Sequence, residues 1–521
     1  MAVPLQLNHF AWTTVVVALL GTLLARFVYA AYTHRGRMQG LPGPPHHPIL
    51  GHLPVIARLK TEYPSDIHPH TYPHLVREKY GLGNIYYLDF WPASPQMLVI
   101  ASPELAQQVS NWKKHQIVRD ILPALTGYHN MIAMEGKEWK TWRSIFNPGF
   151  SVSNLMSLVP GIVEDALVFC DVLAEHAHKE DVFRLEEAAT RLTIDIIGKV
   201  ILDIKLDSQR GENELLDALR SQITWLFDDQ EFNPFKRWRP FRPLAVWWYT
   251  RKMNQYIGKV LDKRFSSRGA AQHTDPKKRP VIDRALDAYL EQEIEGTSSS
   301  KVLAVDKTFR SYAIDQMKTF VFAGHDTTSN LDATAALISS EPHLLNQLDY
   351  SLAIIKEVLR LFPPASTIRQ GGEGMFITDP KTGKQYPTYD MMIWVNHVAV
   401  QRNRDLWDEP DTFKPERFLA SAASTLPKDG YRPFERGPRS CIGQELALLE
   451  IKIIMALTLR RFDIHASFND LAAMANDGSV WAPDEHVGPK RVEVLGDEMY
   501  QMLKATAKPR QGMPTRVNLR A

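Results

Sequence analysis

The longest uninterrupted hydrophobic stretch of the chain lies near its beginning. Residues 10–25 carry no charge, and after Arg26 a second apolar run covers residues 27–32. Together the two runs are long enough to cross a bilayer as one helix. Arg35 and Arg37 follow, which by the positive-inside rule predicts that the N-terminus lies outside and the bulk of the chain in the cytosol. A cleavable signal peptide is the alternative, but no basic segment precedes the apolar run.

This stretch and the proline-rich sequence behind it divide the chain into four parts. We expect a short tail over residues 1–8, a transmembrane signal anchor over 9–32 and a basic, proline-rich hinge over 33–55. Proline fixes φ and lacks an N–H group, so residues 40–45 of the hinge cannot be helical. Residues 56–521 then form one large domain.

Within this domain the hydrophobic positions recur mostly with helical spacing. Residues 158–265 are mainly helical in pattern, and residues 305–329 predict one long helix. Strand patterns are short: residues 85–90 and 97–100 predict a hairpin, separated by the turn-rich segment 91–95. The expected fold class is mainly α with small β-sheets.

Composition narrows the picture in two respects. The 61 basic residues nearly balance the 59 acidic ones, so net charge gives no argument for a nucleic-acid partner. The two cysteines, Cys170 and Cys441, exclude a disulfide framework and fit a reducing compartment. Cys170 lies in an apolar stretch and is most simply a small core residue, which leaves Cys441 as the candidate for chemistry.

Cys441 lies in a loop that predicts a bound thiolate. Two glycines and a proline around it favour a tight, irregular turn, and an apolar helical run begins directly behind it at Gln444. A sulfur at the start of a helix lies near the positive end of the helix dipole, and loop N–H groups can lower its pKa. This arrangement suits ligation of a metal centre. The simpler interpretation is a buried structural cysteine.

The loop resembles the haem-binding signature of the cytochrome P-450 superfamily at five fixed positions: Phe434, Gly437, Arg439, Cys441 and Gly443. The resemblance implies a triangular helical domain that holds heme b between a central helix and the cysteine loop. It also implies that Cys441 is the axial thiolate of the iron, and that Phe434, Arg439 and Gly443 belong to the cofactor site.

Further elements of the chain resemble the same family. Trp139 and Arg143 are spaced i,i+4 on a predicted helix, and in the family this pair holds a haem propionate. Arg369 would hold a propionate as well, with residues 365–368 lining the substrate pocket. Residues between about 119 and 134 would also line it. Taken alone, the tryptophan and arginine would more often be a packing pair with a surface charge.

The predicted central helix carries Ala323-Gly324-His325-Asp326-Thr327-Thr328, which resembles the oxygen-activation motif of the family. The resemblance implies that Asp326 and Thr327 are catalytic. Asp326 would relay protons from solvent, and the Thr327 hydroxyl would donate within the site, as a threonine can where a helix loosens.

Three charged residues are predicted to have an architectural role. Glu357 and Arg360 are spaced i,i+3, and in the family such a pair joins a downstream arginine, here Arg417. A buried network of this kind must be complete, because a lone buried charge is costly. Its task would be to fix the segment that presents Cys441.

One stretch departs from the family. Only 29 residues separate Thr327 from Glu357, and membrane-bound relatives usually have more chain here. Residues 339–342 also interrupt the helical pattern, since the residue before a proline disfavours helix. We hypothesise an internal deletion near residues 330–340, through alternative splicing or an imperfect gene model.

Two surfaces suggest partners. The basic and aromatic segment 236–249 suits either a membrane interface or a helix–helix junction, with equal weight. Lys137, Lys140, Arg432 and Arg436 form either a docking face for an acidic reductase or an ordinary solvated surface.

The resemblance implies a haem-thiolate monooxygenase that oxidises a lipophilic small molecule with O₂. No nicotinamide or flavin fingerprint is visible, so electrons would come from NADPH-cytochrome P-450 reductase, with cytochrome b5 as a further donor. The implied location is the endoplasmic reticulum membrane, and the helices resemble those of filamentous-fungal members of secondary metabolism. The alternatives are a reductase-independent isomerase or dehydratase, and a non-catalytic or degenerate haem-binding isoform. The pair Asp326 and Thr327 argues against the former, and the short 327–357 stretch favours the latter.

Overall fold

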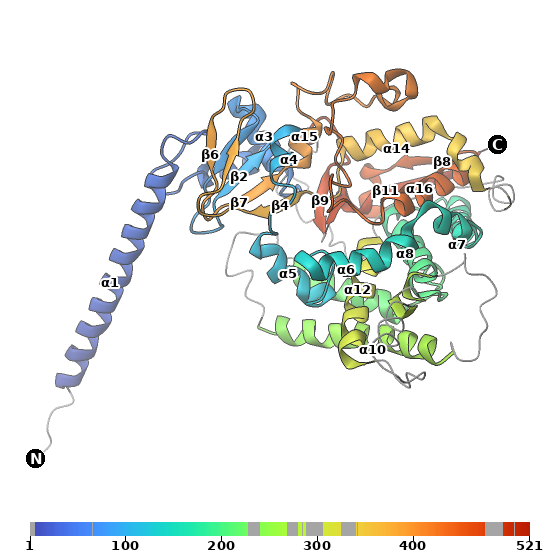
Figure 1. Cartoon of the computed structure of the whole chain (residues 1–521), viewed down its shortest axis with the longest axis horizontal. Coiled ribbons are helices and arrows are strands. Elements are labelled where there is room, and N and C mark those ends of the chain that lie inside the picture. Colours follow the sequence, from blue (N-terminus) through green and yellow to red (C-terminus); the bar gives the residue numbers. More distant parts are fainter. Residues whose placement is uncertain are drawn as a thin grey trace, which may run out of the picture.

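The molecule consists of one long projecting helix and a large body in which helices outnumber small sheets (Figure 1). This computed structural model describes residues 6–64, 66–227, 240–267, 280–283, 285–287, 306–324, 340, 342–474, 493–504 and 506–520. The prediction of a mainly α fold with small β-sheets is confirmed.

The α-helices follow one another along the whole length of the described chain. They are α1 (Gln6–Met38), α2 (Leu53–Glu62), α3 (Thr71–Tyr80), α4 (Pro103–Gln108), α5 (Gln116–Thr126), α6 (Gly136–Phe146), α7 (Val152–Lys179), α8 (Leu185–Ile197), α9 (Glu214–Phe227), α10 (Arg242–Ser267), α12 (Lys307–Gly324), α14 (Asp349–Leu361), α15 (His397–Gln401) and α16 (Gln444–Thr458).

The strands form one sheet of four and three smaller ones. They are β1 (Ile85–Leu88), β2 (Met97–Ile100), β3 (Phe183–Arg184), β4 (Thr367–Gln370), β5 (Phe376–Thr378), β6 (Gln385–Pro387), β7 (Met392–Val395), β8 (Phe462–Ala466), β9 (Gln501–Lys504), β10 (Thr506–Pro509) and β11 (Pro514–Leu519). The larger sheet has the order β1-β2-β7-β4, and the others pair β10 with β9, β5 with β6, and β3 with β11 and β8.

The predicted hairpin is confirmed as β1 and β2, which pair antiparallel with Ile85 opposite Ile100. Every residue of both strands is buried, which explains their continuous run of β-branched, aromatic and other apolar side chains. β2 then pairs parallel with β7, and β7 pairs antiparallel with β4. This order carries β4, and with it Arg369, to the edge of the sheet.

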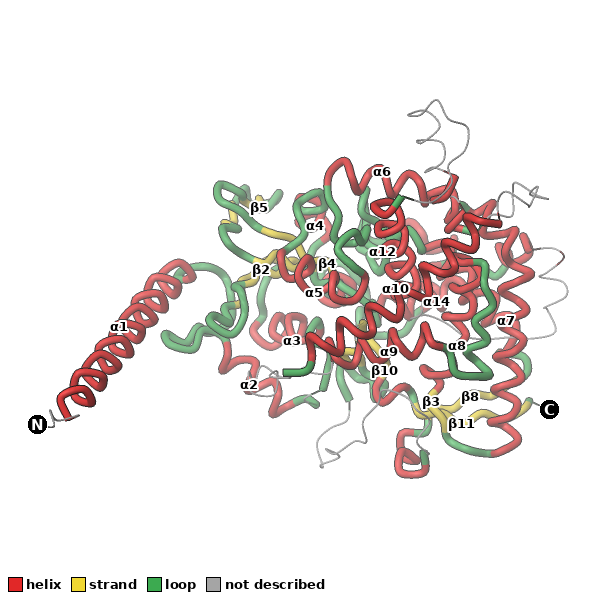
Figure 2. Tube along the Cα trace, turned by 90° about the horizontal axis from the view of Figure 1, so that it is seen from below, coloured by secondary structure: helices red, strands yellow, loops and turns green. Residues whose placement is uncertain are grey.

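The main hydrophobic core lies among the helices, where α12 packs against α5, α8 and α10. Figure 2 shows that the body consists mostly of helices, with a few short strands among them. α16 packs against α7 and α14. Its buried side chains include Leu449, Ile453, Ile454 and Leu457, so burial holds the helix directly behind Cys441. The cysteine loop is thereby fixed to the core at its C-terminal end.

Several sequence expectations fall on residues that the structure does not describe. α12 is described from Lys307 to Gly324, so Asp326 and Thr327 lie outside the described residues. So do residues 236–239 of the basic and aromatic segment, and most of the stretch in which we hypothesise a deletion.

The projecting helix α1 continues past Tyr32, the predicted end of the anchor, to Met38. Its segment Trp12–Met38 is long and apolar enough to cross a membrane, and it is the one such helix among the described residues. Residues 39–45 then leave the helical conformation, as the proline-rich sequence predicts.

Candidate active site

The loop that carries Cys441 is closed by its own backbone. The Cys441 N–H donates to the Phe434 carbonyl at 2.9 Å, and the Ser440 N–H donates to the Gly437 carbonyl at 3.0 Å. Gly437 adopts φ +83°, a left-handed conformation that favours glycine. α16 begins one residue after Gly443, so the sulfur lies at the N-terminal end of this helix.

The protein alone does not stabilise a thiolate at Cys441. The side chain is accessible, yet the protein around it is dense enough that desolvation raises the pKa of the thiol. The N–H groups of Gly443 and Gln444 and the charge of Arg143 act in the opposite direction, but they do not outweigh burial. The prediction that the loop lowers this pKa is therefore wrong in its net direction. A coordinated metal ion would supply the missing stabilisation of the anion.

Arginines surround the loop on the side of β4. Arg369 is 1% exposed, its Nε has no partner among the described residues, and its Nη1 and Nη2 donate to the carbonyls of Ile368 and Ser110 at 3.1 and 3.4 Å. Arg439 lies 4.1 Å above the ring of Trp139, and its Nη1 likewise lacks a partner in the described part of the chain. Desolvation lowers the pKa of Arg439 to about 10 and also lowers that of Arg369.

Lys114 joins this group, and the sequence analysis missed it. A β-bridge places it beside Arg369, and its own N–H donates to a Glu135 carboxylate oxygen at 2.7 Å. Desolvation, together with the charges of Arg369 and Arg439, lowers the pKa of Lys114 to about 7. The residue could not be found from the sequence because it reaches Arg369 only through long-range backbone pairing.

Arg432 corrects one sequence expectation. Its side chain is 1% exposed and donates through Nη2 to Glu435, so it cannot belong to a docking face. Glu435 also lies 3.3 Å from His397 Nε2. Burial acts to raise the pKa of Glu435, but His397 and Arg432 hold it well below its ordinary value. Lys137 and Lys140, in contrast, are exposed.

The balance of charge at this site favours an anionic ligand. The cations are Lys114, Arg369, Arg432 and Arg439, and the acids that act on them are Glu135 and Glu435. Nitrogens of all three arginines lack a hydrogen-bond acceptor in the described structure. Buried donors of this kind are costly unless they are bonded. The residues present therefore fit a group that brings two carboxylates next to Cys441, as haem does.

Trp139 and Arg143, the pair predicted on α6, contact different parts of the site. Trp139 packs its ring under Arg439. Arg143 instead donates through Nη1 to the Ser440 carbonyl at 2.9 Å and through Nε to Asn147 at 2.8 Å. In this geometry Arg143 braces the cysteine loop from the neighbouring helix.

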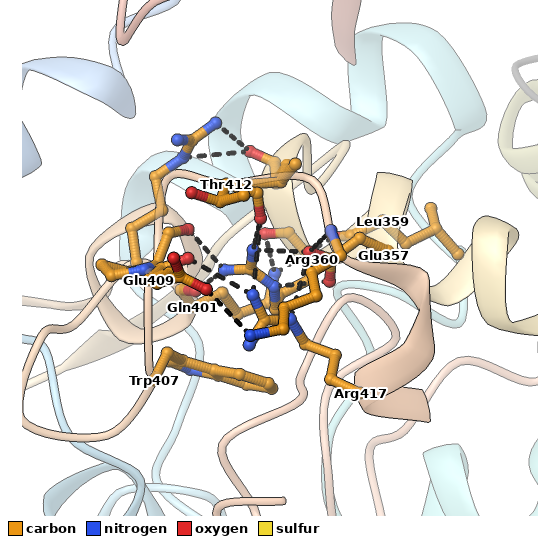
Figure 3. A network of polar contacts seen from close by, with 12 residues as sticks. Glu357, Leu359, Arg360, Gln401, Trp407, Glu409, Thr412 and Arg417 are labelled. Atoms are coloured by element: carbon orange, nitrogen blue, oxygen red, sulfur yellow. Dashed lines mark hydrogen bonds and ion pairs between the residues drawn. The ribbon is translucent and has the colours of Figure 1, made fainter. Parts of the chain in front are cut away.

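The structure brings Glu357, Arg360 and Arg417 together (Figure 3). Arg360 forms a bidentate pair with Glu357 at 2.7 and 2.9 Å, and Arg417 Nε donates to Glu357 at 3.2 Å. Glu357 and Arg360 are fully buried and Arg417 is 8% exposed. The Arg360 guanidinium also donates to the carbonyls of Gln401 and Pro410 at 2.7 and 2.8 Å.

This network is linked to the cysteine loop through Gln401. The Gln401 side chain donates to the carbonyls of Leu359 and Arg360, and its oxygen accepts the Arg432 N–H at 2.7 Å. Arg432 stands two residues before Phe434, where the loop begins. A continuous chain of hydrogen bonds therefore connects α14 to the loop that presents Cys441.

On the opposite side, α12 holds the segment that precedes α6. The Asp315 carboxylate accepts the His129 N–H at 3.1 Å, and the Gln316 side chain accepts the Met131 N–H, also at 3.1 Å. Gly127 packs so closely that an added Cβ would lie 1.9 Å from Asp315 Oδ1. These polar residues of the central helix fix part of the stretch that we expected to line the substrate pocket.

Among the described residues, no group of three or more His, Cys, Asp and Glu side chains could hold a metal ion. Within that part of the chain, Cys441 is thus a candidate for a single protein ligand rather than one member of a multidentate site.

Comparison with known proteins gives the same assignment. The family model described as Cytochrome P450 matches residues 41–334 and 339–486. Cytochrome P450 monooxygenase polC of Polytolypa hystricis is 34% identical, over 96% of this chain and 94% of the relative. Cytochrome P450 monooxygenase acrF of Aspergillus aculeatus is also 34% identical, over 88% of this chain and 98% of the relative. Among solved structures, the crystal structure of the cytochrome P450DA heme domain superposes with a TM-score of 0.62 at 20% identity, covering 92% of this chain and 98% of that one.

The fold, together with a cysteine loop beside unpartnered arginines, thus fits a class of haem-binding proteins. The chain belongs to the cytochrome P450 family and is a cytochrome P450 monooxygenase, similar to fungal members in particular. Family membership implies a haem-iron cofactor.

Proposed function

We propose that the chain uses heme b to insert one oxygen atom of O₂ into a lipophilic small molecule, with electrons from NADPH-cytochrome P-450 reductase. The observation that carries this proposal is the set of unpartnered, buried guanidinium nitrogens beside an accessible cysteine at a helix N-terminus. When bound, the haem supplies the iron at which dioxygen is activated.

The side chains around the loop divide the binding of haem among them. Cys441 is the proposed iron ligand, and Arg369, Arg439 and Lys114 bind the two carboxylates. Trp139 holds the Arg439 guanidinium from below at 4.1 Å. The carbonyl of Phe434 fixes the Cys441 N–H, and the N–H of Gly443 acts on the sulfur to favour the thiolate.

The remaining proposed roles rest on residues around this core. Glu357, Arg360 and Arg417 keep the loop in place through Gln401. Asp326 and Thr327 would move protons to the reacting oxygen, with Asp326 as the relay from solvent and Thr327 as the donor within the site.

Partners and location follow from the surface of the chain. Lys137, Lys140 and Arg436 are exposed and would form the docking face for the reductase, with cytochrome b5 as a further donor. α1 would anchor the protein in the endoplasmic reticulum membrane. Trp247 and Trp248 on α10 are 54% and 51% exposed, which favours a membrane interface over a helix–helix junction.

Reconstitution with the reductase tests this function. The haem-loaded full chain should oxidise members of a library of lipophilic metabolites only when NADPH, O₂ and reductase are all present. A product that gains no oxygen atom, or turnover without reductase, would instead indicate an isomerase or dehydratase of the same family.

A degenerate isoform is the second candidate, and one observation favours it. The family match is interrupted between residues 334 and 339, and the alignment with polC spans 544 positions against 521 residues in this chain. The relative therefore contains segments that this chain lacks. Sequencing the transcript decides the matter: a longer message with an apolar helical insert near residues 330–340 would support the deletion. A message without it would refute the deletion.

A further inference from the structure

The end of α1 is fixed to the catalytic domain by one buried carboxylate. Asp89 is fully buried and accepts hydrogen bonds from Arg35 and from the Nε2 atoms of His34 and His46, the last two at 2.9 Å. Arg35 also donates to the carbonyls of Ile49 and Trp91 at 2.8 and 2.7 Å. The anchor helix is thus clamped at its cytosolic end rather than joined only by a flexible tether.

Aromatic and backbone packing reinforce this clamp. Phe27 and His34 both stack on the ring of Trp91, with ring centres 5.3 and 5.2 Å away. Gly51, at φ +58°, leaves no room for a side chain, since an added Cβ would lie 2.5 Å from the Asp89 carbonyl oxygen. The last turns of α1 therefore form a fixed wall beside the domain.

A cleft of about 860 Å³ lies along this wall. One side of it is formed by Ala30, Thr33, His34 and Arg37 of α1, and the other by residues 91–96 and the start of α5. Gln370 and Asp390 complete the lining. In Figure 1 the upper end of α1, the sheet that contains β2, β4 and β7, and α5 lie near one another.

The position of the cleft relative to the bilayer follows from the length of a membrane-spanning helix. About 20 residues of helix at about 1.5 Å per residue cross the hydrocarbon core of a bilayer. Counted from Trp12, where the apolar span begins, this core ends near Ala31. The backbone of Arg37 then lies about 9 Å past the hydrocarbon edge, just beyond a head-group layer that is about 5–8 Å thick, and its long side chain reaches back into that layer.

The charges that line the cleft balance one another. Arg37, Arg119, Asp120 and Asp390 are exposed, and within the described part of the chain none of these four side chains forms an ion pair. His115 adds no charge: desolvation lowers its pKa, and its Nδ1 accepts the Ile117 N–H at 3.1 Å. The Arg37 guanidinium lies 5.8 Å over the ring of Tyr389, a contact that leaves its N–H groups open to an anion. Among the described residues, the cleft thus offers two guanidiniums and two carboxylates without ion-pair partners.

We propose that this cleft binds the head group of one phosphatidylethanolamine molecule. The phosphate would pair with Arg37 and Arg119, and the ammonium would donate to Asp120 and Asp390. An anionic head group would leave the two carboxylates opposed to its charge, and a choline group has no N–H to donate to them. The inference rests on the proposed membrane anchoring by α1.

Native mass spectrometry of the haem-loaded full chain tests the site. The protein is released from nanodiscs of equimolar phosphatidylcholine, phosphatidylethanolamine and phosphatidylglycerol, and the retained lipid is identified. The wild type should retain one phosphatidylethanolamine in about tenfold preference over either other lipid. In the double variant Arg37→Gln/Arg119→Gln, the amount of retained phosphatidylethanolamine should fall by about tenfold. A larger loss is not expected, because these side chains are exposed and exposed charge pairs contribute less to binding than buried ones. The double variant Asp120→Asn/Asp390→Asn should prefer phosphatidylglycerol.

Arg58→Gln is the matched control, because Arg58 is an exposed arginine on α2 that does not line the cleft, and it should behave as the wild type. Unchanged melting temperatures and Soret spectra establish that the variants are folded. The proposal is overturned if the wild type retains no lipid, prefers phosphatidylglycerol, or is unaffected by the cleft substitutions. Co-flotation with vesicles distinguishes failure of the head-group site from failure of the membrane anchor. Protein that floats with the vesicles but retains no lipid selectively refutes only the site. Protein that does not float refutes the anchor as well.

Discussion

The protein contains two buried groups of arginines that differ in how completely they are paired. Around Glu357, the guanidiniums of Arg360 and Arg417 share one carboxylate and donate to the carbonyls that surround them. Around Cys441, nitrogens of Arg369 and Arg439 point at no acceptor in the described structure.

This difference separates architecture from ligand binding. A buried charge network is tolerable only when every member is satisfied, and the Glu357 group meets that condition from within the chain. The group beside Cys441 does not meet it, because nitrogens of Arg369, Arg432 and Arg439 have no acceptor among the described residues. Its missing acceptors have to come from a ligand, and the carboxylates of haem match that need.

Breaking the complete group should have the largest effect on stability. Glu357→Gln removes the negative charge that Arg360 and Arg417 share, and it leaves two buried cations uncompensated. We expect a loss of about 3–5 kcal/mol in the free energy of unfolding. Chemical denaturation of the purified variant measures it, and a loss below about 1 kcal/mol would show that the network is not structural.

A substitution in the arginine group beside Cys441 should weaken haem binding without lowering the stability of the fold. Arg369→Met removes a buried cation with a free Nε, so the free energy of unfolding of the haem-free protein should not fall. Loss of a hydrogen bond to a charged group, at about 1.5–3 kcal/mol, should speed haem transfer to apomyoglobin by about 10- to 100-fold. An unchanged transfer rate would exclude Arg369 from the haem site.

The excess of cations beside Cys441 should also make the stability of the haem-free protein depend on pH. Burial lowers the pKa of Lys114 from 10.5 to about 7, so the folded state binds fewer protons than the unfolded state between these values. Stability should therefore rise with pH from about 7 toward 10, with a slope of at most about one proton. Denaturation midpoints measured across this range should lose that slope in Lys114→Met, and a slope that persists in the variant would assign it to another group.

The smallest effect should come from the same substitution at a second buried glutamate. Glu450 on α16 is 1% exposed, and burial raises its pKa well above the ordinary value, which favours the uncharged form. Glu450→Gln puts a neutral amide of similar shape in its place and should change the free energy of unfolding by less than about 1 kcal/mol. A loss as large as that of Glu357→Gln would contradict the distinction between paired and unpaired sites.

Several features of the fold and of the site could be predicted from short stretches of the sequence. The short apolar runs within residues 85–90 and 97–100, separated by a turn-rich segment, predicted the hairpin. The glycines and proline around Cys441 predicted an irregular loop before a helix. The spacing of Glu357 and Arg360 required them to share one helical face. Each of these features depends on neighbours within a few residues.

Long-range features escaped the sequence. Lys114 and Arg369 meet only through strand pairing, and Arg432 was placed on the surface because a basic residue in a loop is usually solvated. The pKa of Cys441 depends on how densely the fold packs around it, which no spacing reveals. The clamp at Asp89 likewise requires the end of α1 to lie against the turn that follows β1.

The central claim is that the sulfur of Cys441 holds the haem iron. The carbon monoxide difference spectrum of the reduced Cys441→Ser variant tests it most directly, beside Cys170→Ser, which removes the other cysteine from the core. The account predicts that Cys441→Ser abolishes the absorption band characteristic of thiolate ligation, while Cys170→Ser retains it. A Cys441→Ser variant that keeps this band would show that another group binds the iron.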